Sequence, residues 1–508
     1  MSTVYDLITS APEETDALRA PGRPPLSNAA LRTLITDTMT TLNGLGIGRN
    51  DRVAIVLPNG PEMAASFIAV AACATAAPLN PAYKRDEFEF YLSDLKAKAL
   101  IVPKGSVSPA LEAAHAAGVA VIFLNFEETN PAGAFTIEAA EQTGAAVTPQ
   151  TGFAKPDDVA LVLHTSGTTS RPKIVPLSQR NICASAGNIQ KTLRLETSDV
   201  CMNVMPLFHI HGLMACTLAP LSAGCPVFAT PGFDALKFFS WLSESRPTWY
   251  SAVPTMHQAI LTRAKRNQGA IESAQLRFIR SSSASLPPSV LADLESTFSA
   301  PVVEAYAMTE AAHQMTCNPL PPEVRKPGTV GQAAGPEVAI MDEETAELLT
   351  PGKAGEVVIR GENVTKGYES NEAANAVSFV EGWFRTGDQG VMDNDGYLTI
   401  TGRLKEIINR GGEKISPREV DEILLDHSDI AQAVTFAIPH KMLGEEVGAA
   451  VVLKSGGTAG ADEIRAFATE KLAAFKVPRK IVVLDEIPKG PTGKLQRIGL
   501  AEKLGLTS

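Results

Sequence analysis

Helical and strand-like patterns alternate along the first 150 residues, and this alternation constrains the fold more than any other feature. Residues 28–45 repeat apolar side chains at helical spacing, and residues 51–58 form a short apolar run closed by proline. Residues 62–77 are again helical, and residues 99–103 form another short strand. Because a strand–helix–strand unit is the usual connection between parallel strands, the pattern predicts an α/β fold with parallel-rich sheets flanked by helices.

The pattern changes in the second half of the chain. Strand-like runs continue at residues 159–164 and 302–306, but from about Gly328 glycines and short β-rich runs dominate. We expect a β-barrel-like subdomain there, completing a large N-terminal domain of residues 1–401. A compact α+β pattern follows over residues 406–508, which we expect to be a small C-terminal cap domain. Since no long linker precedes it, any motion of this domain would need a hinge over residues 402–405.

Charge and composition exclude several classes of protein. The 508 residues include 45 Lys and Arg against 56 Asp and Glu, for a net charge of −11. A protein that binds nucleic acid through its phosphates needs a concentrated basic face, so we expect no nucleic-acid partner. The longest apolar stretch, residues 63–78, is mostly alanine and is short for a bilayer span, so we expect a buried helix and no membrane span.

The six cysteines form no Cys-x-x-Cys pair and no ligand cluster. In a chain of this length, that distribution indicates free, mostly buried thiols in a reducing compartment. The start of the chain has neither the positive charge nor the apolar core of a signal peptide. We therefore expect a cytoplasmic protein, as a monomer or homodimer, that acts on small molecules.

The segment from Leu163 to Lys173 leaves an apolar strand and is rich in hydroxyl side chains. Small hydroxyl donors, exposed backbone N–H groups and a lysine together suit a polyphosphate. The segment lacks the spacing of a Walker A loop. Taken alone, a polar turn that happens to be rich in Ser and Thr fits equally well. The candidate phosphate ligands are Thr165, Ser166, Gly167, Thr168, Thr169 and Lys173.

Four further blocks follow in a fixed order, and with the loop they resemble the adenylate-forming superfamily of acyl-CoA synthetases, luciferases and peptide-synthetase adenylation domains. One departure is Ser170, which stands where that family usually has glycine. The four blocks are Tyr306-Ala-Met-Thr-Glu310, Trp383-Phe-Arg-Thr-Gly-Asp388, Gly402-Arg-Leu-Lys-Glu-Ile-Ile-Asn-Arg-Gly-Gly-Glu-Lys-Ile-Ser-Pro417 and Pro488-Lys-Gly-Pro-Thr-Gly-Lys494.

The resemblance implies an acid–CoA ligase that uses ATP (converted to AMP), Mg²⁺ and CoA as co-substrate. Its catalytic residues would be Lys494, Thr309 and Glu310, with Glu310 also the metal ligand. The resemblance further assigns the hinge to Lys405 and the CoA-facing turn to Gly411 and Gly412. Besides the loop residues, the ATP ligands that it implies are Ser283, Ala284, Glu304, Tyr306, Asp388 and Arg403.

The residues of the expected acyl pocket are polar. The resemblance places this pocket between residues 206–212, residues 280–286 and a helix after Glu310. Fatty-acid enzymes of this family line the pocket with apolar or small residues, whereas this chain has His209, Ser283 and His313 in the corresponding segments. A buried donor without a partner costs about 1–3 kcal/mol, so a polar pocket implies a short, polar acid. Residues 206–212, 248–254, 277–281, 304–310 and 409–417 look like the corresponding blocks of oxalate–CoA ligases, whose oxalate contacts would fall on the same three residues.

Several alternatives stay open. His211 or His257 is an alternative substrate ligand, and Ser282 with Ser283 is an alternative adenine-binding turn. The substrate is alternatively a short- or medium-chain or aromatic acid, and the acceptor a thiol other than CoA. A protein that keeps the fold only to bind nucleotide is disfavoured, because such a protein would not need Lys494.

Overall fold

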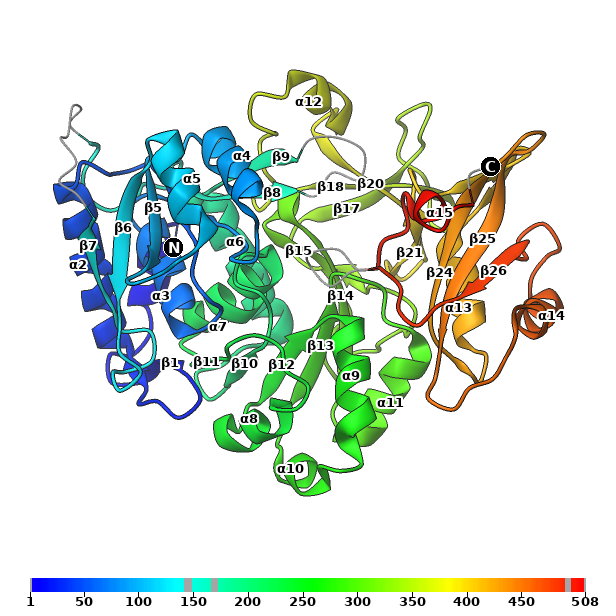
Figure 1. Cartoon of the computed structure of the whole chain (residues 1–508), viewed down its shortest axis with the longest axis horizontal. Helices are drawn as coiled ribbons and strands as arrows, with labels where there is room; N and C mark the ends of the chain where they lie inside the picture. The colour runs from blue at the N-terminus through cyan, green and yellow to red at the C-terminus, as the bar shows by residue number, and fades with distance from the viewer. Residues whose placement is uncertain (1, 141–148, 166–171, 489–494, 507–508) are drawn as a thin grey trace.

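A seven-stranded sheet forms one side of the large N-terminal body (Figure 1). This computed structural model describes residues 2–140, 149–165, 172–488 and 495–506. The strand order is β7-β6-β5-β3-β4-β8-β9; the inner strands run parallel, and β7 and β9 are antiparallel to their neighbours. The elements are α2 (Asn28–Gly44), β3 (Arg52–Ile55), α3 (Pro61–Ala71), β4 (Thr75–Pro78), α4 (Arg85–Leu95), β5 (Ala99–Pro103), α5 (Pro109–Ala117), β6 (Ala120–Asn125), β7 (Thr136–Ala139), β8 (Val159–Thr165) and β9 (Lys173–Ser178).

A second, nine-stranded sheet has the order β16-β15-β14-β13-β12-β10-β11-β1-β2. Its N-terminal and middle elements are α1 (Val4–Thr9), β1 (Asp16–Arg19), β2 (Leu26–Ser27), α6 (Gln179–Leu193), β10 (Cys201–Asn203), the π-helix η1 (His211–Leu218), α7 (Ala219–Ser222), β11 (Val227–Ala229) and α8 (Phe238–Ser245). The later ones are β12 (Trp249–Ala252), α9 (Pro254–Ala264), α10 (Gln268–Ser273), β13 (Phe278–Ser282), α11 (Pro288–Phe298), β14 (Val302–Met308), the 3-10 turn η2 (Thr309–Ala311), β15 (His313–Cys317) and β16 (Gln332–Ala333).

The two sheets share one hydrophobic core. Helix α3 is buried along its whole length, because its small alanine side chains allow close packing on both sides. The aromatic rings of Trp249 and Phe278 stack with centroids 5.2 Å apart on adjacent strands of the second sheet. Burial of this continuous apolar surface is the main force that holds the two sheets together.

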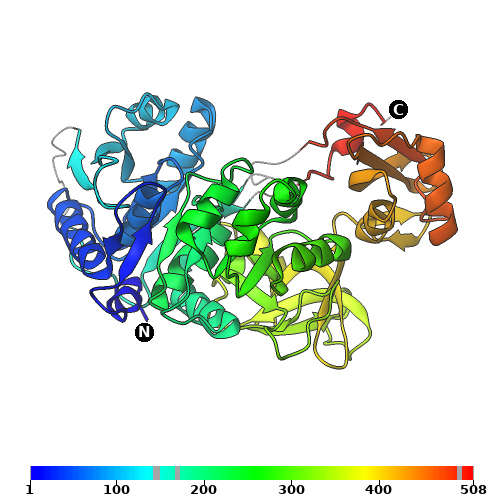
Figure 2. The ribbon, with the colours of Figure 1, turned by 90° about the horizontal axis from the view of Figure 1, so that it is seen from below.

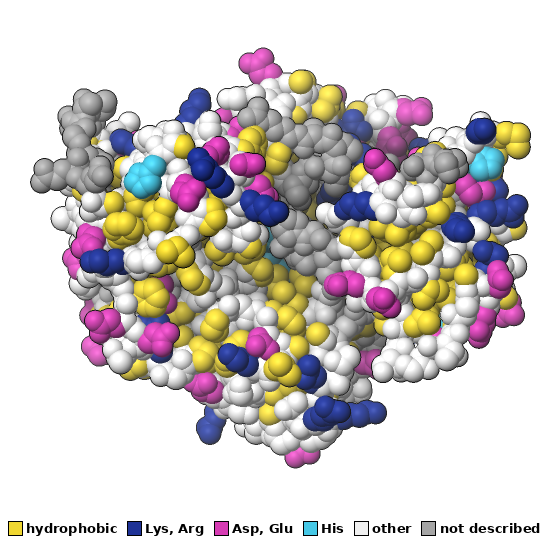
Figure 3. Space-filling view, viewed as in Figure 1, with side chains coloured by type: hydrophobic (Ala, Val, Ile, Leu, Met, Phe, Trp, Pro, Cys, Tyr) yellow, Lys and Arg dark blue, Asp and Glu magenta, His cyan; other side chains and the backbone are white. Residues whose placement is uncertain are grey.

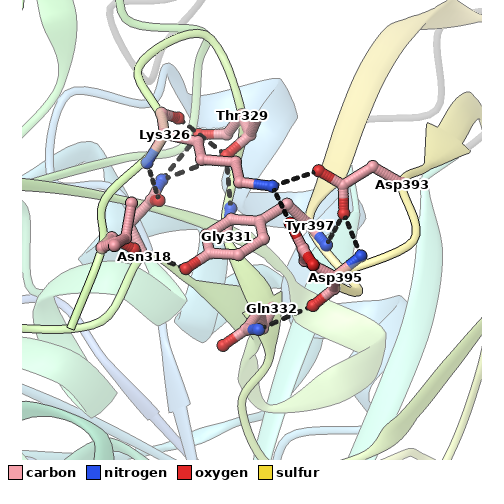
Figure 4. A network of polar contacts seen from close by, with 9 residues as sticks. Asn318, Lys326, Thr329, Gly331, Gln332, Asp393, Asp395 and Tyr397 are labelled. Carbon is pink, nitrogen blue, oxygen red and sulfur yellow. Dashed lines mark hydrogen bonds and ion pairs between the residues drawn. The ribbon is translucent and has the colours of Figure 1, made fainter.

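A five-stranded antiparallel sheet follows, in the order β17-β18-β20-β19 with β21 paired to β20. A polar network fastens the loop before it: Lys326 Nζ bonds Asp393 at 2.6 Å and Asp395 at 2.7 Å, and lies over the Tyr397 ring (Figure 4). The network also fixes Gly331, where an added Cβ would lie 2.0 Å from the backbone of Asn318. The elements are β17 (Glu337–Met341), β18 (Ala354–Arg360), α12 (Glu372–Ser378), β19 (Phe379–Val380), β20 (Trp383–Met392) and β21 (Leu398–Arg403).

The C-terminal part forms a separate α+β unit at one end of the molecule (Figure 2). It meets the preceding sheet through Ser416 and Arg418, which donate to the carbonyl groups of Thr401 and Ile400. These contacts border a cavity of about 380 Å³. The elements are β22 (Ile408–Arg410), β23 (Glu413–Ile415), α13 (Pro417–Leu425), β24 (Ile430–His440), β25 (Gly444–Leu453), α14 (Ala461–Lys471), β26 (Lys480–Val483) and α15 (Leu500–Lys503).

The predicted α/β class is confirmed, and one boundary is corrected. The helix expected over residues 62–77 ends at Ala71, and Thr75–Pro78 is strand β4, wholly buried in the first sheet. All six cysteines are buried free thiols, as predicted. In the part of the chain that the structure describes, no helix has both the length and the apolar character to cross a bilayer.

Candidate active site

The predicted phosphate loop connects the two strands of a hairpin. Thr165 ends β8 and Lys173 begins β9, and the two residues are register partners across the antiparallel pair. Ser166, Gly167, Thr168 and Thr169 lie outside the described residues, as does Ser170. The hairpin therefore places the two ends of the predicted loop side by side.

Lys173 and Glu310 meet through a tyrosine that the sequence did not indicate. The Lys173 Nζ lies 4.2 Å from the ring centroid of Tyr368, and the Tyr368 hydroxyl donates to Glu310 Oε1 at 2.8 Å. Burial raises the pKa of Glu310, which is 6% exposed, whereas burial lowers the pKa of Lys173. The cluster thus combines a buried carboxylate with a cation at the loop end of the hairpin.

Glu310 fits a magnesium ion. Mg²⁺ in phosphate-transferring sites is usually held by one or two carboxylates, with substrate phosphates and water completing the shell. A buried carboxylate whose pKa is raised gains stability when a cation neutralises it. Among the described residues there is no group of three or more His, Cys, Asp or Glu side chains that could hold a metal alone. The donor set therefore suits a cation that is shared with a phosphate.

The turn after Glu310 differs from the prediction. We expected a helix there; the chain instead forms the short turn η2 and then strand β15. Ala312 and His313 have φ of +47° and +104°, which strains residues that carry a Cβ. Hydrogen bonds from distant parts of the chain stabilise this strained turn. Ser185 Oγ donates to the Ala312 carbonyl at 2.5 Å, and the Asn363 amide donates to the carbonyl groups of Ala311 and Gln314. This fixed turn is what buries His313 beside the predicted acyl pocket.

The predicted ATP ligand Asp388 already accepts two protein hydrogen bonds. The Tyr306 hydroxyl donates to Asp388 Oδ2, and Arg403 Nε donates to Oδ1 at 2.8 Å. Each carboxylate oxygen has a second lone pair, so both oxygens have room for a further hydrogen bond. The predicted residues Tyr306, Asp388 and Arg403 therefore come together from β14, β20 and the end of β21.

The side chain of Glu304 is buried and bonds the protein backbone instead of facing solvent. Its Oε1 accepts from the backbone N–H of Leu286 at 2.9 Å, and burial raises its pKa to about 7. Glu304 therefore fixes the turn that carries Ser283 and Ala284, of which Ala284 is exposed. Ser282, one of the alternative adenine contacts, is buried and donates to the Ala305 carbonyl at 2.8 Å.

His211 lies between two serines at the predicted acyl pocket. Its Nδ1 is 3.0 Å from Ser283 Oγ, and its Nε2 is 2.7 Å from Ser251 Oγ. The rings of His211 and His313 are 5.0 Å apart, edge to face. His209 is half-buried two residues before His211. Residues of η1, β12, β15 and the turn after β13 therefore converge here.

The alternative ligand His257 lies elsewhere. Adjacent side chains of a strand point to opposite faces, and His257 contacts Tyr250 whereas His211 contacts its neighbour Ser251. Burial lowers the pKa of His257 to about 4, so this imidazole is neutral. His257 therefore belongs to the core on the far side of the sheet.

Only some of the site residues predicted in the C-terminal part of the chain lie among the described residues. Lys405 follows β21, and its charge adds slightly to the lowering of the Lys173 pKa, which comes mainly from burial. Gly411 and Gly412 form the exposed turn between β22 and β23, with φ of +60° and +97°. Lys494 lies outside the described residues.

The positive charge of the site is local. On the face shown in Figure 3, Lys and Arg side chains are interspersed with Asp and Glu, and the chain as a whole is acidic. The charges of Arg403 and Lys173 both favour the ionised form of the Glu310 carboxyl, against the burial that raises its pKa. An anionic substrate would therefore meet cations in the site rather than across the surface.

Two family models cover most of the chain. The model described as AMP-binding enzyme matches residues 25–369, and the model described as AMP-binding enzyme C-terminal domain matches residues 419–494.

The curated relatives include two that are named oxalate–CoA ligase. One, from Arabidopsis thaliana, is 47% identical over 95% of this chain and 94% of its own length. The other, from Saccharomyces cerevisiae, is 44% identical over 94% of this chain and 91% of its own length. Among solved structures, ATP-bound MatB from Rhodopseudomonas palustris matches with a TM-score of 0.88 at 27% identity, covering 99% of this chain and 98% of that one.

Proposed function

Since the chain belongs to the AMP-binding enzyme family, we propose that it is an ATP-dependent acid–CoA ligase that converts oxalate and CoA to oxalyl-CoA, AMP and pyrophosphate. The single observation that carries the choice of acid is the polar wall of the acyl pocket. There Ser283 and the buried His313 meet around His211, where an alkyl chain would lie against polar side chains without hydrogen bonding to them.

The reaction needs two displacements. An oxygen of the substrate carboxylate attacks the α-phosphorus of ATP and expels pyrophosphate, and the CoA thiolate then attacks the acyl carbon and expels AMP. The first displacement brings two anions together, so cations must offset their charge and hold them in line. Mg²⁺ held by Glu310 would supply part of that charge.

The other roles in the reaction belong to residues of the chain itself. Lys173 faces the β- and γ-phosphates at the loop end of the hairpin, Thr309 bonds the α-phosphate, and Asp388 binds the ribose. Lys494, brought in by the C-terminal domain, bridges the substrate carboxylate and the α-phosphate. Movement about Lys405 replaces Lys494 with the Gly411–Gly412 turn for the thiol step. Ser283, His209 and His313 hold the second carboxylate of oxalate.

A product balance tests the proposal. With oxalate, ATP, Mg²⁺ and CoA we expect thioester, AMP and pyrophosphate in equal amounts, and only slow pyrophosphate release when CoA is omitted. Formation of ADP, or AMP release that does not depend on a thiol, would contradict it. Replacing CoA with a carrier protein's phosphopantetheine arm separates CoA from another thiol acceptor.

His313→Ala distinguishes oxalate from a larger or apolar acid. Since His313 is buried beside the acyl pocket and not at the nucleotide residues, we expect a loss of about ten- to a hundred-fold in kcat/KM for oxalate with an unchanged KM for ATP. An equal loss for hexanoate would favour the short- or medium-chain alternative.

A further inference from the structure

A chain of hydrogen bonds runs from a buried arginine to the acyl pocket. Arg280 on β13 is fully buried, and its Nη1 donates to Ser251 Oγ on the neighbouring strand β12 at 3.4 Å. Ser251 and Arg280 are register partners in the parallel pair, so the contact is built into the sheet. Ser251 in turn meets His211, and His211 meets Ser283.

The direction of each bond follows from chemistry. A guanidinium only donates, so Ser251 Oγ accepts from Arg280. The described contacts of this buried hydroxyl are Arg280 and His211, and an unpaired buried O–H costs about 1–3 kcal/mol. The Ser251 hydrogen therefore goes to His211 Nε2, which must accept it.

The role of Nε2 as an acceptor also determines the role of the other ring nitrogen, Nδ1. A neutral imidazole has one acceptor and one donor, and here the acceptor is Nε2, so Nδ1 carries the hydrogen. Nδ1–H then donates to Ser283 Oγ. An imidazolium is disfavoured, because both ring nitrogens would donate and the ring would be a second buried cation near Arg280.

We propose that the Arg280–Ser251–His211 chain sets the direction of the Ser283 hydroxyl, so that its hydrogen points into the acyl pocket as a donor. A carboxylate only accepts hydrogen bonds, so a Ser283 that is held as a donor selects a second carboxylate on the substrate. This inference rests on the proposed function for the identity of the acid, but the direction of the bonds does not depend on it. Arg280 and Ser251 are thus positioning residues that act through His211 and Ser283.

The local backbone supports this arrangement. His211 begins a π-helix, a form that is frequent at functional sites, and a Cβ at the next residue, Gly212, would lie 2.3 Å from the Pro206 carbonyl oxygen. Ser283 has a φ of +72°, and its turn is fixed by the bond between Glu304 and Leu286. The backbone therefore holds His211 and Ser283, the two members of the chain of bonds that lie at the acyl pocket, in place.

The tautomer of His211 tests the inference directly. In the full-length protein labelled with ¹⁵N in its histidine rings, two-bond proton–nitrogen spectra distinguish a protonated Nδ1 from a protonated Nε2. The eight histidines are few enough to assign His211 by comparison with His211→Asn. We expect the Nδ1–H tautomer, which is the less common one in water. A protonated Nε2 would overturn the proposal whether or not oxalate is the substrate.

A kinetic arm tests the consequence for specificity. In Ser251→Ala we expect kcat/KM for oxalate to fall about ten- to a hundred-fold, as for loss of a hydrogen bond to a charged group, while that for acetate and the KM for ATP change less than about three-fold. Ser66→Ala, which removes another buried hydroxyl of the same domain, is the control and should alter none of them. Equal losses for oxalate and acetate would contradict a role in selecting the second carboxylate.

The spectrum and the kinetic experiment together distinguish failure of the proposed function from failure of the inferred bond direction. If the wild-type protein activates no oxalate but His211 is the Nδ1–H tautomer, the proposed function fails and the direction of the bonds stands. If oxalate is the substrate but Nε2 is protonated, the inference alone fails. If Ser251→Ala does not fold, the spectrum of the wild-type protein still decides.

Discussion

The hydroxyl of Tyr368, in the loop between β18 and α12, donates to Glu310 in the turn η2 at 2.8 Å, although the two residues are far apart in the sequence. The same ring supports Lys173 on its face. One side chain thus connects the predicted metal ligand to the predicted phosphate ligand. The bond stabilises the ionised form of a carboxyl whose pKa burial raises.

Tyr368→Phe should weaken the response to magnesium. The ring remains under Lys173, but Glu310 loses its donor, so its pKa rises further and the carboxylate binds a cation less well. We expect the Mg²⁺ concentration for half-maximal oxalate-dependent ATP–pyrophosphate exchange to rise about three- to ten-fold. Tyr397→Phe, which removes a hydroxyl of the network in Figure 4, is the matched control. An unchanged magnesium requirement would show that Glu310 does not hold the metal.

Asp388→Asn should impair nucleotide binding. The carboxylate meets donors on both oxygens, and an amide turns one of its N–H groups toward either Tyr306 or Arg403. We expect the KM for ATP to rise about ten- to a hundred-fold with little change in the KM for oxalate. Asp395→Asn, an exposed partner of Lys326, should leave both constants unchanged. Equal changes in the two KM values would argue for a general distortion instead.

Glu304 should make stability depend on pH. Its pKa is about 7 in the folded chain because of burial, above the ordinary value of 4.5. The folded state therefore retains the proton longer than the unfolded state, and stability falls as pH rises from about 4.5 to 7. Glu304→Gln keeps the acceptor for Leu286 but cannot ionise, so we expect it to be more stable than wild type by about 2–3 kcal/mol at pH 8.

Denaturant titrations at pH 5 and pH 8 check this difference. At pH 5 the folded wild-type chain already carries the proton, so the two proteins should be closer in stability there. A difference that is the same at both pH values would mean that Glu304 does not titrate in this range.

Lys494→Ala should abolish formation of the acyl adenylate. The proposed role is to offset charge that develops at the α-phosphate, and loss of one such donor costs about a hundred- to a thousand-fold in rate. ATP binding, measured by equilibrium dialysis, should change little. Lys503→Ala, which removes an exposed side chain of the last helix, is the control. Unchanged pyrophosphate exchange in Lys494→Ala would refute the assigned mechanism.

Much of the fold could be predicted because its strands and helices have distinct periods. The helix of residues 28–44 and the strand of residues 99–103 were predicted nearly to the residue. The boundary between α3 and β4 was missed because residues 63–77 are almost uniformly small and apolar, so no change of period marks the turn.

The site was predictable only where its residues lie within contiguous motifs. Tyr306, Glu310 and Asp388 stand in such blocks, and the structure brings them to one region. Tyr368, Ser251 and Arg280 were missed, because their roles arise from register between strands and from contacts between distant segments that no local spacing encodes. The strand after Glu310 was mistaken for a helix, because positive φ at Ala312 and His313 is imposed by Ser185 and Asn363 from outside the segment.

The ratio of kcat/KM for oxalate to that for hexanoate, measured by CoA-thioester formation within a panel that also includes malonate, succinate and acetate, tests the central claim most directly. The polar wall around Ser283, His211 and His313 predicts oxalate as the preferred substrate, by at least about a hundred-fold over hexanoate, because an alkyl chain would lie against polar side chains without hydrogen bonding to them. A preference for hexanoate would contradict the account.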